Sequence, residues 1–501
     1  MGLVGKGARL AGGAFVLMVA SSGTLSAQMA ATNSTAARDA AATITVADMQ
    51  KHMGVIAHDS MRGRNTPSPE LMKTARYVAD RFKDFGLAPG NGDSYLQLYP
   101  ISSIVPAGPS AHDLALTGPD GVTELGYGDE FFTLHDARLS EGGGPLAVVD
   151  IAGDFGNVDG RIVTVLLTAE NIRPVLRGGL AEKLGPHDPA GVLVVLDIPQ
   201  NFFDQLKNFL SDTQTRVGEV KDTSFPAAFV ALSALPADLA AVVSEGTSAE
   251  GWSAHIRSEA SVNVVEAPNT IGWLEGSDPE LKNEYVVLTA HMDHVGVGRP
   301  VDGDSIYNGA DDDASGTVTV IELAQAFASL PQAPRRSMVF MTVSGEEKGL
   351  LGSGWYADHP TFPLAQTVAN LNMDMVGRNW TDTIVAIGKE ESTLGPLVER
   401  VAAEHPELDM AVIDDLWPEE GFYSRSDHYN FARNGVPVLF FFNGTHDDYH
   451  RPSDHADKIA YDKMSRIGRL VFYTGYEIAN ADDRPAWDAA AYGRVVEKSS
   501  E

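Results

Sequence analysis

The chain has 501 residues, of which 44% are hydrophobic and 21% charged. This is the composition of a soluble globular protein, and the length exceeds one ordinary core, so we expect more than one domain. The 37 Lys and Arg residues stand against 68 Asp and Glu, a formal net charge of -31, which argues against nucleic acid and anionic lipid as partners. No cysteine is present, which excludes disulfides, lipoprotein acylation and thiol catalysis.

The first 27 residues have the organisation of a secretory signal peptide. Lys6 and Arg9 precede an apolar segment at 10–20, and Ala27 closes a small-residue cleavage site. The apolar segment is shorter than the roughly 20 residues that cross a bilayer, so we expect no stable membrane insertion after cleavage. The sequence therefore predicts export to the periplasm or the extracellular space. Residues 28–40 are small and polar and are predicted to form a disordered spacer.

The remaining chain changes character twice. Residues 137–258 carry short β-type runs separated by Gly and Pro, which predicts a β-rich inserted domain. The flanking segments 41–136 and 259–485 are expected to form one discontinuous domain around this insert, followed by a C-terminal tail at 486–501.

Strands and helices alternate in the flanking segments. Apolar side chains at helical spacing predict two helices, 67–85 and 316–329. Short continuous apolar runs predict four strands, at 284–290, 337–343, 368–372 and 436–442. Apolar strands separated by helices are typical of a sheet buried on both faces. We therefore predict an α/β fold with a mostly parallel, mixed sheet that helices cover on both sides.

Acidic and imidazole side chains follow the predicted strands where each strand ends. Ligands bind at the carboxyl ends of strands in open α/β sheets, and several buried carboxylates repel one another unless a cation lies among them. Each group alone has an ordinary reading, such as a helix N-cap or a solvated turn. Their joint occurrence favours a metal site of oxygen and nitrogen ligands, which suits zinc first and also manganese or cobalt. The residues are His291, Asp293, His294, Asp311, Asp312, Asp313, Glu346, Glu347, Asp374 and His450.

Six segments resemble the co-catalytic zinc aminopeptidase family, which includes bacterial leucyl aminopeptidases and, more distantly, glutamate carboxypeptidase and the transferrin receptor ectodomain. They are AHMDHVG at 290–296, NGADDDASG at 308–316, SGEEKGLLGSGWY at 344–356, NMDMVGR at 372–378, SDHYNFARNGVP at 426–437 and DYHRPSDHADKI at 448–459. The predicted insert, with AGVLVVLDIP and FPAAFVALSALPADL, looks like a protease-associated domain.

The resemblance implies two zinc ions per chain and a role for each matching residue. His291 and Asp374 would hold one zinc, Glu347 and His450 the second, and Asp312 would bridge them. It also implies that Glu346 is the general base, that Tyr449 stabilises the oxyanion, and that Asp293 orients the imidazole of His291.

Two positions depart from the family pattern. Asp313 stands where the family commonly has Asn, and Asp454-His455 stands where Asp-Thr is usual. We expect His294 and His428 to have structural roles rather than to bind metal. The family also implies a cis peptide bond between Asp312 and Asp313.

The resulting expectation is a zinc exopeptidase that removes N-terminal residues from peptide substrates. A carboxypeptidase or dipeptidase of the glutamate carboxypeptidase type is the first alternative, because Arg378, Arg425 and Arg451 flank the motifs; Glu419 and Glu420 instead favour a cationic amine terminus. A receptor-like binding protein and a one-zinc, glutaminyl cyclase-like transferase are less compatible with the complete ligand set. Whether the insert covers the active site is left open.

Overall fold

The structure is a computed structural model that describes residues 35–172, 179–210 and 213–497. The predicted signal peptide lies outside these residues. The chain divides into two compact units, one formed by Met1–Tyr99 with Ala267–Glu501 and the other by Pro100–Glu266. It passes between them within strands β2 (Leu96–Pro106) and β12 (Ser253–Leu274). The second unit therefore begins earlier and ends later than the predicted insert at 137–258.

A mixed sheet forms the centre of the first unit. Strands β16 (Ser337–Val343), β13 (Tyr285–His291), β17 (Thr367–Met373) and β20 (Val438–Phe442) are mutually parallel in this order. The C-terminal part of β12 pairs antiparallel with β16 and with β1 (Ala88–Pro89). At the other side, β18 (Thr383–Ile387) is antiparallel to β20 and parallel to β19 (Ala411–Ile413).

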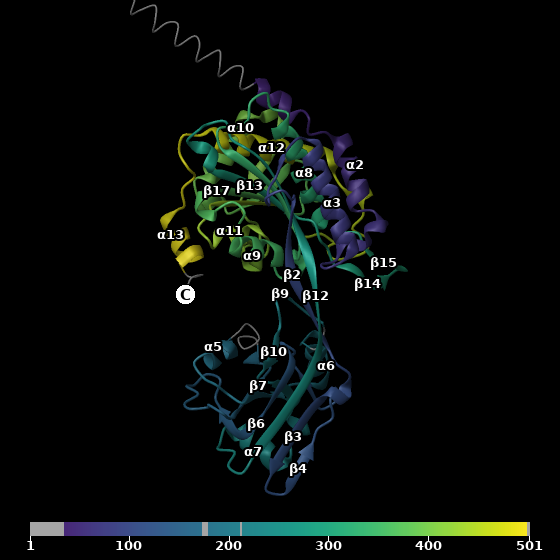
Figure 1. The fold of residues 1–501 in the computed structure, drawn as a ribbon, viewed down its shortest axis with the longest axis vertical. Helices are drawn as coiled ribbons and strands as arrows, with labels where there is room; N and C mark the ends of the chain where they lie inside the picture. The colour runs from purple at the N-terminus through teal and green to yellow at the C-terminus, as the bar shows by residue number, and fades with distance from the viewer. Residues whose placement is uncertain (1–34, 173–178, 211–212, 498–501) are drawn as a thin grey trace, which may run out of the picture. The chain divides into compact units, whose positions relative to one another are not determined.

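Helices cover both faces of this sheet (Figure 1). One core joins Val286 and Leu288 of β13 to the apolar sides of α2 (Val46–Ile56), α3 (Pro69–Asp84), α8 (Gly316–Ala328), α10 (Leu394–Glu404) and α12 (Tyr461–Asn480). Val287, on the opposite face, packs in a second core with α9 (Leu351–Asp358) and α11 (His428–Ala432). The fold class predicted from the sequence is confirmed, because alternate residues of each central strand are buried on opposite faces.

Two expectations about the ends of this unit need correction. Residues 35–40 of the predicted disordered spacer are helical, and Ala37 and Ala40 are buried in the main core. Small alanines allow a helix to pack closely, which composition alone does not distinguish from a flexible spacer. The segment predicted as a tail includes α13 (Ala489–Tyr492), and its Trp487 Nε1 donates a hydrogen bond to Gly435 O at 2.9 Å.

The second unit is rich in β-structure. Strands β6 (Ala137–Val149), β7 (Ile162–Thr168), β8 (Gly191–Asp197) and β11 (Ala227–Ala231) pair in parallel. The N-terminal part of β12 pairs antiparallel with β6 and with β3 (His112–Gly118), which continues into a hairpin with β4 (Gly121–Glu124). Strand β5 (Phe131–Thr133) pairs antiparallel with β11.

Shorter elements complete the second unit. Strand β9 (Gln214–Val217) pairs with β2, and β10 (Lys221–Ser224) pairs with β6. The helices of this unit that lie wholly within the described residues include α5 (Leu180–Leu184), α6 (Gln200–Leu210) and α7 (Ala237–Glu245). Two separate clusters of buried apolar side chains give this unit its own core. Among the residues that the structure describes in either unit, no helix is long and apolar enough to cross a membrane.

Candidate metal centre and active site

The candidate site lies at the carboxyl edge of the four parallel strands. Strand β13 ends at His291, and Asp374 directly follows β17. After β16, left-handed turns at Gly345 (φ 73°) and Gly349 (φ 98°) enclose a short 3₁₀ helix, Glu346–Lys348. Glycine adopts these dihedral angles without steric cost. The ends of parallel strands meet at one edge, so residues far apart in the sequence converge there.

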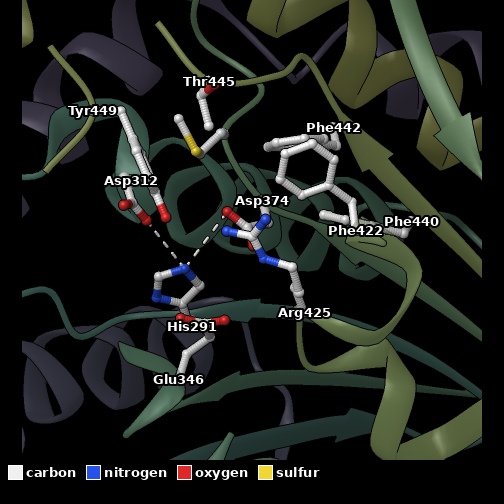
Figure 2. Close-up of a pocket in the computed structure, with 11 residues that line it drawn as sticks. His291, Asp312, Glu346, Asp374, Phe422, Arg425, Phe440, Phe442, Thr445 and Tyr449 are labelled. Carbon is white, nitrogen blue, oxygen red and sulfur yellow. Dashed lines mark ion pairs between the residues drawn. The ribbon is translucent and has the colours of Figure 1, made fainter. Parts of the chain in front are cut away.

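Asp312 lies between two imidazoles, with one carboxylate oxygen near each. Its Oδ1 is 3.3 Å from His291 Nε2, and its Oδ2 is 3.1 Å from His450 Nε2. His291 Nε2 is also 3.5 Å from Asp374 Oδ1, and His450 Nε2 is 3.0 Å from Glu347 Oε2. Figure 2 shows the His291 contacts. The five residues predicted as ligands thus form two groups that share Asp312.

Several of these atoms are buried without a hydrogen-bond partner. Among the described residues, Asp312 Oδ2, Glu347 Oε1 and His450 Nε2 have none. Buried polar atoms in native proteins are almost always hydrogen-bonded or bound to an ion. Carboxylate oxygens and imidazole nitrogens are suitable zinc ligands. The residues present therefore fit a cation at this position.

His291 is held from its second nitrogen. His291 Nδ1 lies 3.2 Å from the carbonyl oxygen of Asp293 and 3.7 Å from its Oδ1. The Asp293 carboxylate accepts hydrogen bonds from Thr66 Oγ1 at 2.9 Å and from the backbone N–H of Glu346 at 3.3 Å. Burial opposes protonation of His291, but the charges of Asp374 and Glu346 outweigh it and hold its pKa well above the ordinary value.

Asp313 is anchored by backbone hydrogen bonds, and its carboxylate also lies close enough to His291 and Asp374 to hold a cation with them. Its Oδ2 accepts the N–H of His291 at 3.1 Å, and its Oδ1 accepts those of Gly316 at 2.8 Å and Met375 at 3.1 Å. Both oxygens are used, which an amide side chain with one acceptor oxygen could not reproduce. The departure from the family pattern therefore has a local explanation. The peptide bond between Asp312 and Asp313 is cis.

Glu346 and Tyr449 line the same pocket as His291, Asp312 and Asp374. Burial raises the pKa of the Glu346 carboxyl well above its ordinary value, while the nearby His291 opposes this shift. Burial also raises the pKa of Tyr449, so its hydroxyl keeps its proton. The Tyr449 ring stacks on His450, with the ring centres 4.0 Å apart. The pocket therefore brings the carboxyl group of Glu346 and the hydroxyl of Tyr449 to the candidate metal ligands.

Three phenylalanine rings form half of the rest of the pocket wall (Figure 2). Phe442 lies 4.9 Å from Phe422 and 5.1 Å from Phe440 between ring centres. Arg425 also lines the pocket, and its guanidinium carbon is 4.6 Å from the centre of the Phe422 ring. The pocket thus combines apolar walls with one basic side chain.

The structure places His294 closer to the cluster than the sequence interpretation did. Its side chain is fully buried, with Nδ1 2.7 Å from Glu347 Oε1 and 3.6 Å from Asp312 Oδ2. Its position three residues after His291 in the H-x-D-H segment was a signal for this proximity. The side chains of Asp312, Glu347, His450 and His294 can together surround one cation.

The other singled-out residues lie outside the ligand cluster. His428 is buried and stacks on Phe440, with ring centres 4.4 Å apart. The carboxylate of Asp454 accepts the backbone N–H of Asp311 at 2.9 Å and of Asp312 at 3.2 Å, so it supports the bridging loop. His455 Nε2 is 3.7 Å from Asp304 on a largely accessible surface.

Comparisons with known proteins agree with this geometry. Residues 269–475 match the model of peptidase family M28. Aminopeptidase YwaD of Bacillus subtilis (strain 168) is 30% identical over 212 residues, which are 40% of this chain and 43% of that protein. A probable glutamate carboxypeptidase of Arthroderma benhamiae is 25% identical over 46% of this chain and 33% of its own length. The chain thus spans less than half the length of these two curated relatives.

A solved structure supports the fold. The aminopeptidase from Aneurinibacillus sp. strain AM-1 superposes with a TM-score of 0.55 and 19% identity, covering 89% of this chain and 97% of that one. At this identity the likeness concerns the fold alone. The matched residues 269–475 contain every predicted metal ligand, the predicted base Glu346 and Tyr449. Residues 269–475 of this chain are thus similar to peptidase family M28.

Proposed function

We propose that this protein is a two-zinc aminopeptidase that hydrolyses the N-terminal peptide bond of its substrates. The observation that carries the proposal is the position of Asp312, whose two oxygens lie 3.3 Å and 3.1 Å from the imidazoles of His291 and His450. A carboxylate with one oxygen directed to each of two groups is suited to bridge a pair of metal ions. The YwaD relative, named an aminopeptidase, supports the same activity.

The proposed zinc ligands are the two groups that share Asp312. His291 and Asp374 complete one site, and Glu347 and His450 complete the other. Manganese or cobalt can substitute where the ligands are oxygen and nitrogen. Zinc at such a site lowers the pKa of a bound water molecule to near 7, which supplies a nucleophile at neutral pH.

Glu346 is the proposed general base. It is next to the ligand Glu347 in the same short helix, and it lines the pocket without being a member of either ligand group. It would accept a proton from the attacking water and transfer it to the leaving amine as the carbon–nitrogen bond breaks. The Tyr449 hydroxyl would donate a hydrogen bond to the carbonyl oxygen as negative charge develops there.

The pocket supports an apolar N-terminal side chain beside the reacting carbonyl. Phe422, Phe440 and Phe442 form its walls, which suits a hydrophobic residue. Arg425 favours a second candidate function, because a guanidinium at the pocket can bind a substrate carboxylate. That function is a carboxypeptidase or dipeptidase activity. Arg378 is a weaker candidate for this role, since it already pairs with Asp448 at 2.9 Å.

Two further parts of the proposal concern the rest of the chain. The N-terminal 27 residues would direct export to the periplasm or beyond. The β-rich unit Pro100–Glu266 would be a protease-associated-type insert. Its place in the sequence, between the two chain segments that form the first unit, supports this.

Hydrolysis of leucyl-arylamide and of N-blocked dipeptides, with zinc counted per chain, tests the proposal. We expect two zinc ions per chain, cleavage of the free-amine substrate and no cleavage of the blocked set. In the variant Arg425→Met, leucyl-arylamide cleavage should remain. Cleavage of the blocked dipeptides alone, and its loss in Arg425→Met, would instead establish the second candidate function.

A further inference from the structure

A short N-terminal segment, Asp59–Arg64 with Asn65 and Thr66, lies directly against the ligand-bearing loops. It precedes the residues matched by the family model by about two hundred positions in the chain. Arg64 in this segment is completely buried, with an exposed fraction of 0%. Within the described part of the chain, no carboxylate lies within 4.0 Å of its guanidinium. A buried arginine without an ion-pair partner is uncommon, because an unpaired buried charge is costly.

The guanidinium of Arg64 donates to four backbone carbonyl oxygens instead. Nε donates to Met292 O at 2.8 Å, and Nη2 donates to Gly309 O at 2.9 Å. Nη1 donates to Asn308 O at 2.6 Å and to Ile56 O, at the end of α2, at 2.9 Å. Four of the five N–H donors of one planar group are therefore used at fixed angles.

Three of these carbonyls, those of Met292, Asn308 and Gly309, belong to two loops that bear candidate metal ligands. Met292 directly follows His291, and Gly309 opens the loop that contains Asp312. The backbone carbonyl oxygen of Arg64 also accepts a hydrogen bond from the backbone N–H of His294, at 3.4 Å. The Arg64 side chain thus connects the loop after His291, a proposed ligand of one zinc ion, to the loop that carries Asp312, the proposed bridge between both ions. Its positive charge also interacts with the nearby Asp293 and Asp312.

Thr66 extends this connection to a third loop. Its hydroxyl donates to Asp293 Oδ2 at 2.9 Å and accepts the N–H of Gly345 at 3.0 Å. Gly345 directly precedes Glu346 and Glu347. The Thr66 hydroxyl therefore connects the residue that holds His291 to the turn that carries the proposed base.

The backbone of the segment is held in an unfavourable conformation. Arg62, Gly63 and Arg64 all have positive φ angles, of 47°, 67° and 50°. A Cβ atom at Gly63 would lie 2.3 Å from Tyr307 O and 2.5 Å from Gly296 O, so only glycine fits there. Strained residues persist where the surroundings fix them, and they concentrate at functional sites.

We propose that Arg64 and Thr66 are positioning residues of the metal centre, so that the N-terminal segment is part of the metal-binding machinery. This inference rests on the proposed function, since it assumes that the cluster holds zinc. Arg64 sets the spacing between the His291 and Asp312 loops, and Thr66 sets the position of the Glu346–Glu347 turn relative to Asp293. Partners of this kind typically contribute about 10–100-fold to metal affinity.

The test compares Arg64→Met and Arg64→Lys with Arg336→Met in the full chain. Arg336 is the matched control, since its side chain is also 0% exposed, in the same unit, and it donates to Ile478 O at 2.9 Å and to Glu284 Oε2 at 2.6 Å. It directly precedes β16, whereas Glu347 follows the opposite end of that strand. Zinc affinity is measured by competition with a chromophoric chelator, and the metal-free melting temperature is measured alongside it.

We expect the zinc dissociation constant to rise at least about 10-fold in Arg64→Met. Arg64→Lys should fall between Arg64→Met and the wild type, because an ammonium keeps the charge but has fewer donors in a different geometry. Arg336→Met should lose stability with zinc affinity within about 2-fold of wild type, as expected where no metal ligand or its partner is touched. Equal zinc affinity in wild type and Arg64→Met, with stability lost as in Arg336→Met, would overturn the proposal.

Two further results keep the inference separate from the proposed function. If neither Arg64 variant folds, Thr66→Val decides, since it removes one hydroxyl without a change of shape. It should lower kcat and weaken zinc binding with KM unchanged, and unaltered kcat and zinc affinity would refute the positioning role. Wild-type protein that binds no zinc would instead refute the proposed function itself.

Discussion

Asp312 Oδ2 lies 3.1 Å from His450 Nε2, although Asp312 precedes helix α8 and His450 follows strand β20. Despite this distance, neither atom makes a hydrogen bond of normal geometry with any described residue. The fold therefore places a carboxylate oxygen and an imidazole nitrogen side by side, and this arrangement is suited to binding a cation. A divalent cation satisfies both groups and relieves the repulsion among the neighbouring carboxylates.

The first prediction concerns the proposed base. Glu346→Gln removes the proton acceptor and no ligand, so kcat should fall by about 10²–10⁴-fold while both zinc ions remain bound. Glu347→Gln is the matched control, because it should lose zinc from the site that His450 shares. Steady-state kinetics and metal analysis check both. Wild-type turnover in Glu346→Gln would exclude the assigned mechanism.

Chelation should destabilise the protein. Without metal, the side chains of Asp312, Glu347 and Asp374, each at most 10% exposed, lie in one cluster and their charges repel. Metal that binds only the folded state stabilises it by mass action, about 4 kcal/mol at a thousand times the dissociation constant. The melting temperature should fall by several degrees on removal of zinc and recover when zinc is restored. A melting temperature that is indifferent to chelation would contradict a shared site.

Asp313→Asn tests the structural explanation of the Asp at this position. The amide has one acceptor oxygen for three backbone N–H groups, so at least one donor loses its partner. We expect a loss of roughly 1–3 kcal/mol in the free energy of unfolding, the usual effect of an unsatisfied buried donor. Denaturant unfolding of the zinc-loaded protein measures it. A more stable variant would show that the extra charge, rather than its hydrogen bonds, dominates.

A buried pair far from the metal site predicts a pH dependence of stability. Glu322 Oε1 lies 3.6 Å from His52 Nε2, and Oε2 accepts the N–H of Thr45 at 3.3 Å. Burial raises the pKa of Glu322 from 4.5 to about 8 and lowers that of His52 from 6.5 to about 4. The contribution of Glu322 to the free energy of unfolding is complete below pH 4.5 and is lost as the pH rises through 8. The contribution of His52 to the free energy of unfolding is complete above pH 6.5 and is lost as the pH falls through 4.

Glu322→Gln should therefore flatten the fall in melting temperature between pH 4.5 and 8. Glu280→Gln, at an exposed position, serves as the control and should follow the wild-type curve. Calorimetry of the three proteins across this range makes the comparison. Parallel curves for wild type and Glu322→Gln would mean that Glu322 is ionised in the folded protein.

Most of the first unit could be predicted from the sequence, because its signals are local. Strand 337–343 was predicted with the bounds that β16 has, and helix 316–329 differs from α8 by one residue. Apolar runs between helical patterns identify buried parallel strands whatever their partners. His291, Glu347 and Asp374 lie at or just after the ends of such runs, whereas Asp312 and His450 lie in loops and were assigned from the family resemblance.

The parts that could not be predicted depend on distant contacts. Arg64 lies in a short segment between Gly63 and Pro67, and nothing local in that segment indicates that four carbonyls from three separate segments surround its side chain. The position of His294 beside Glu347 likewise depends on how two strand ends meet. The limits of the second unit, Pro100–Glu266, follow from strand pairing along β12, which composition does not encode.

The most direct test of the central claim is a crystal structure of the active protein with anomalous data collected at the zinc absorption edge. The account predicts two anomalous peaks, about 3.5–4 Å apart, with Asp312 between them, His291 and Asp374 at one, and Glu347 and His450 at the other. A fully active protein with a single peak, or with zinc bound away from Asp312, would contradict it.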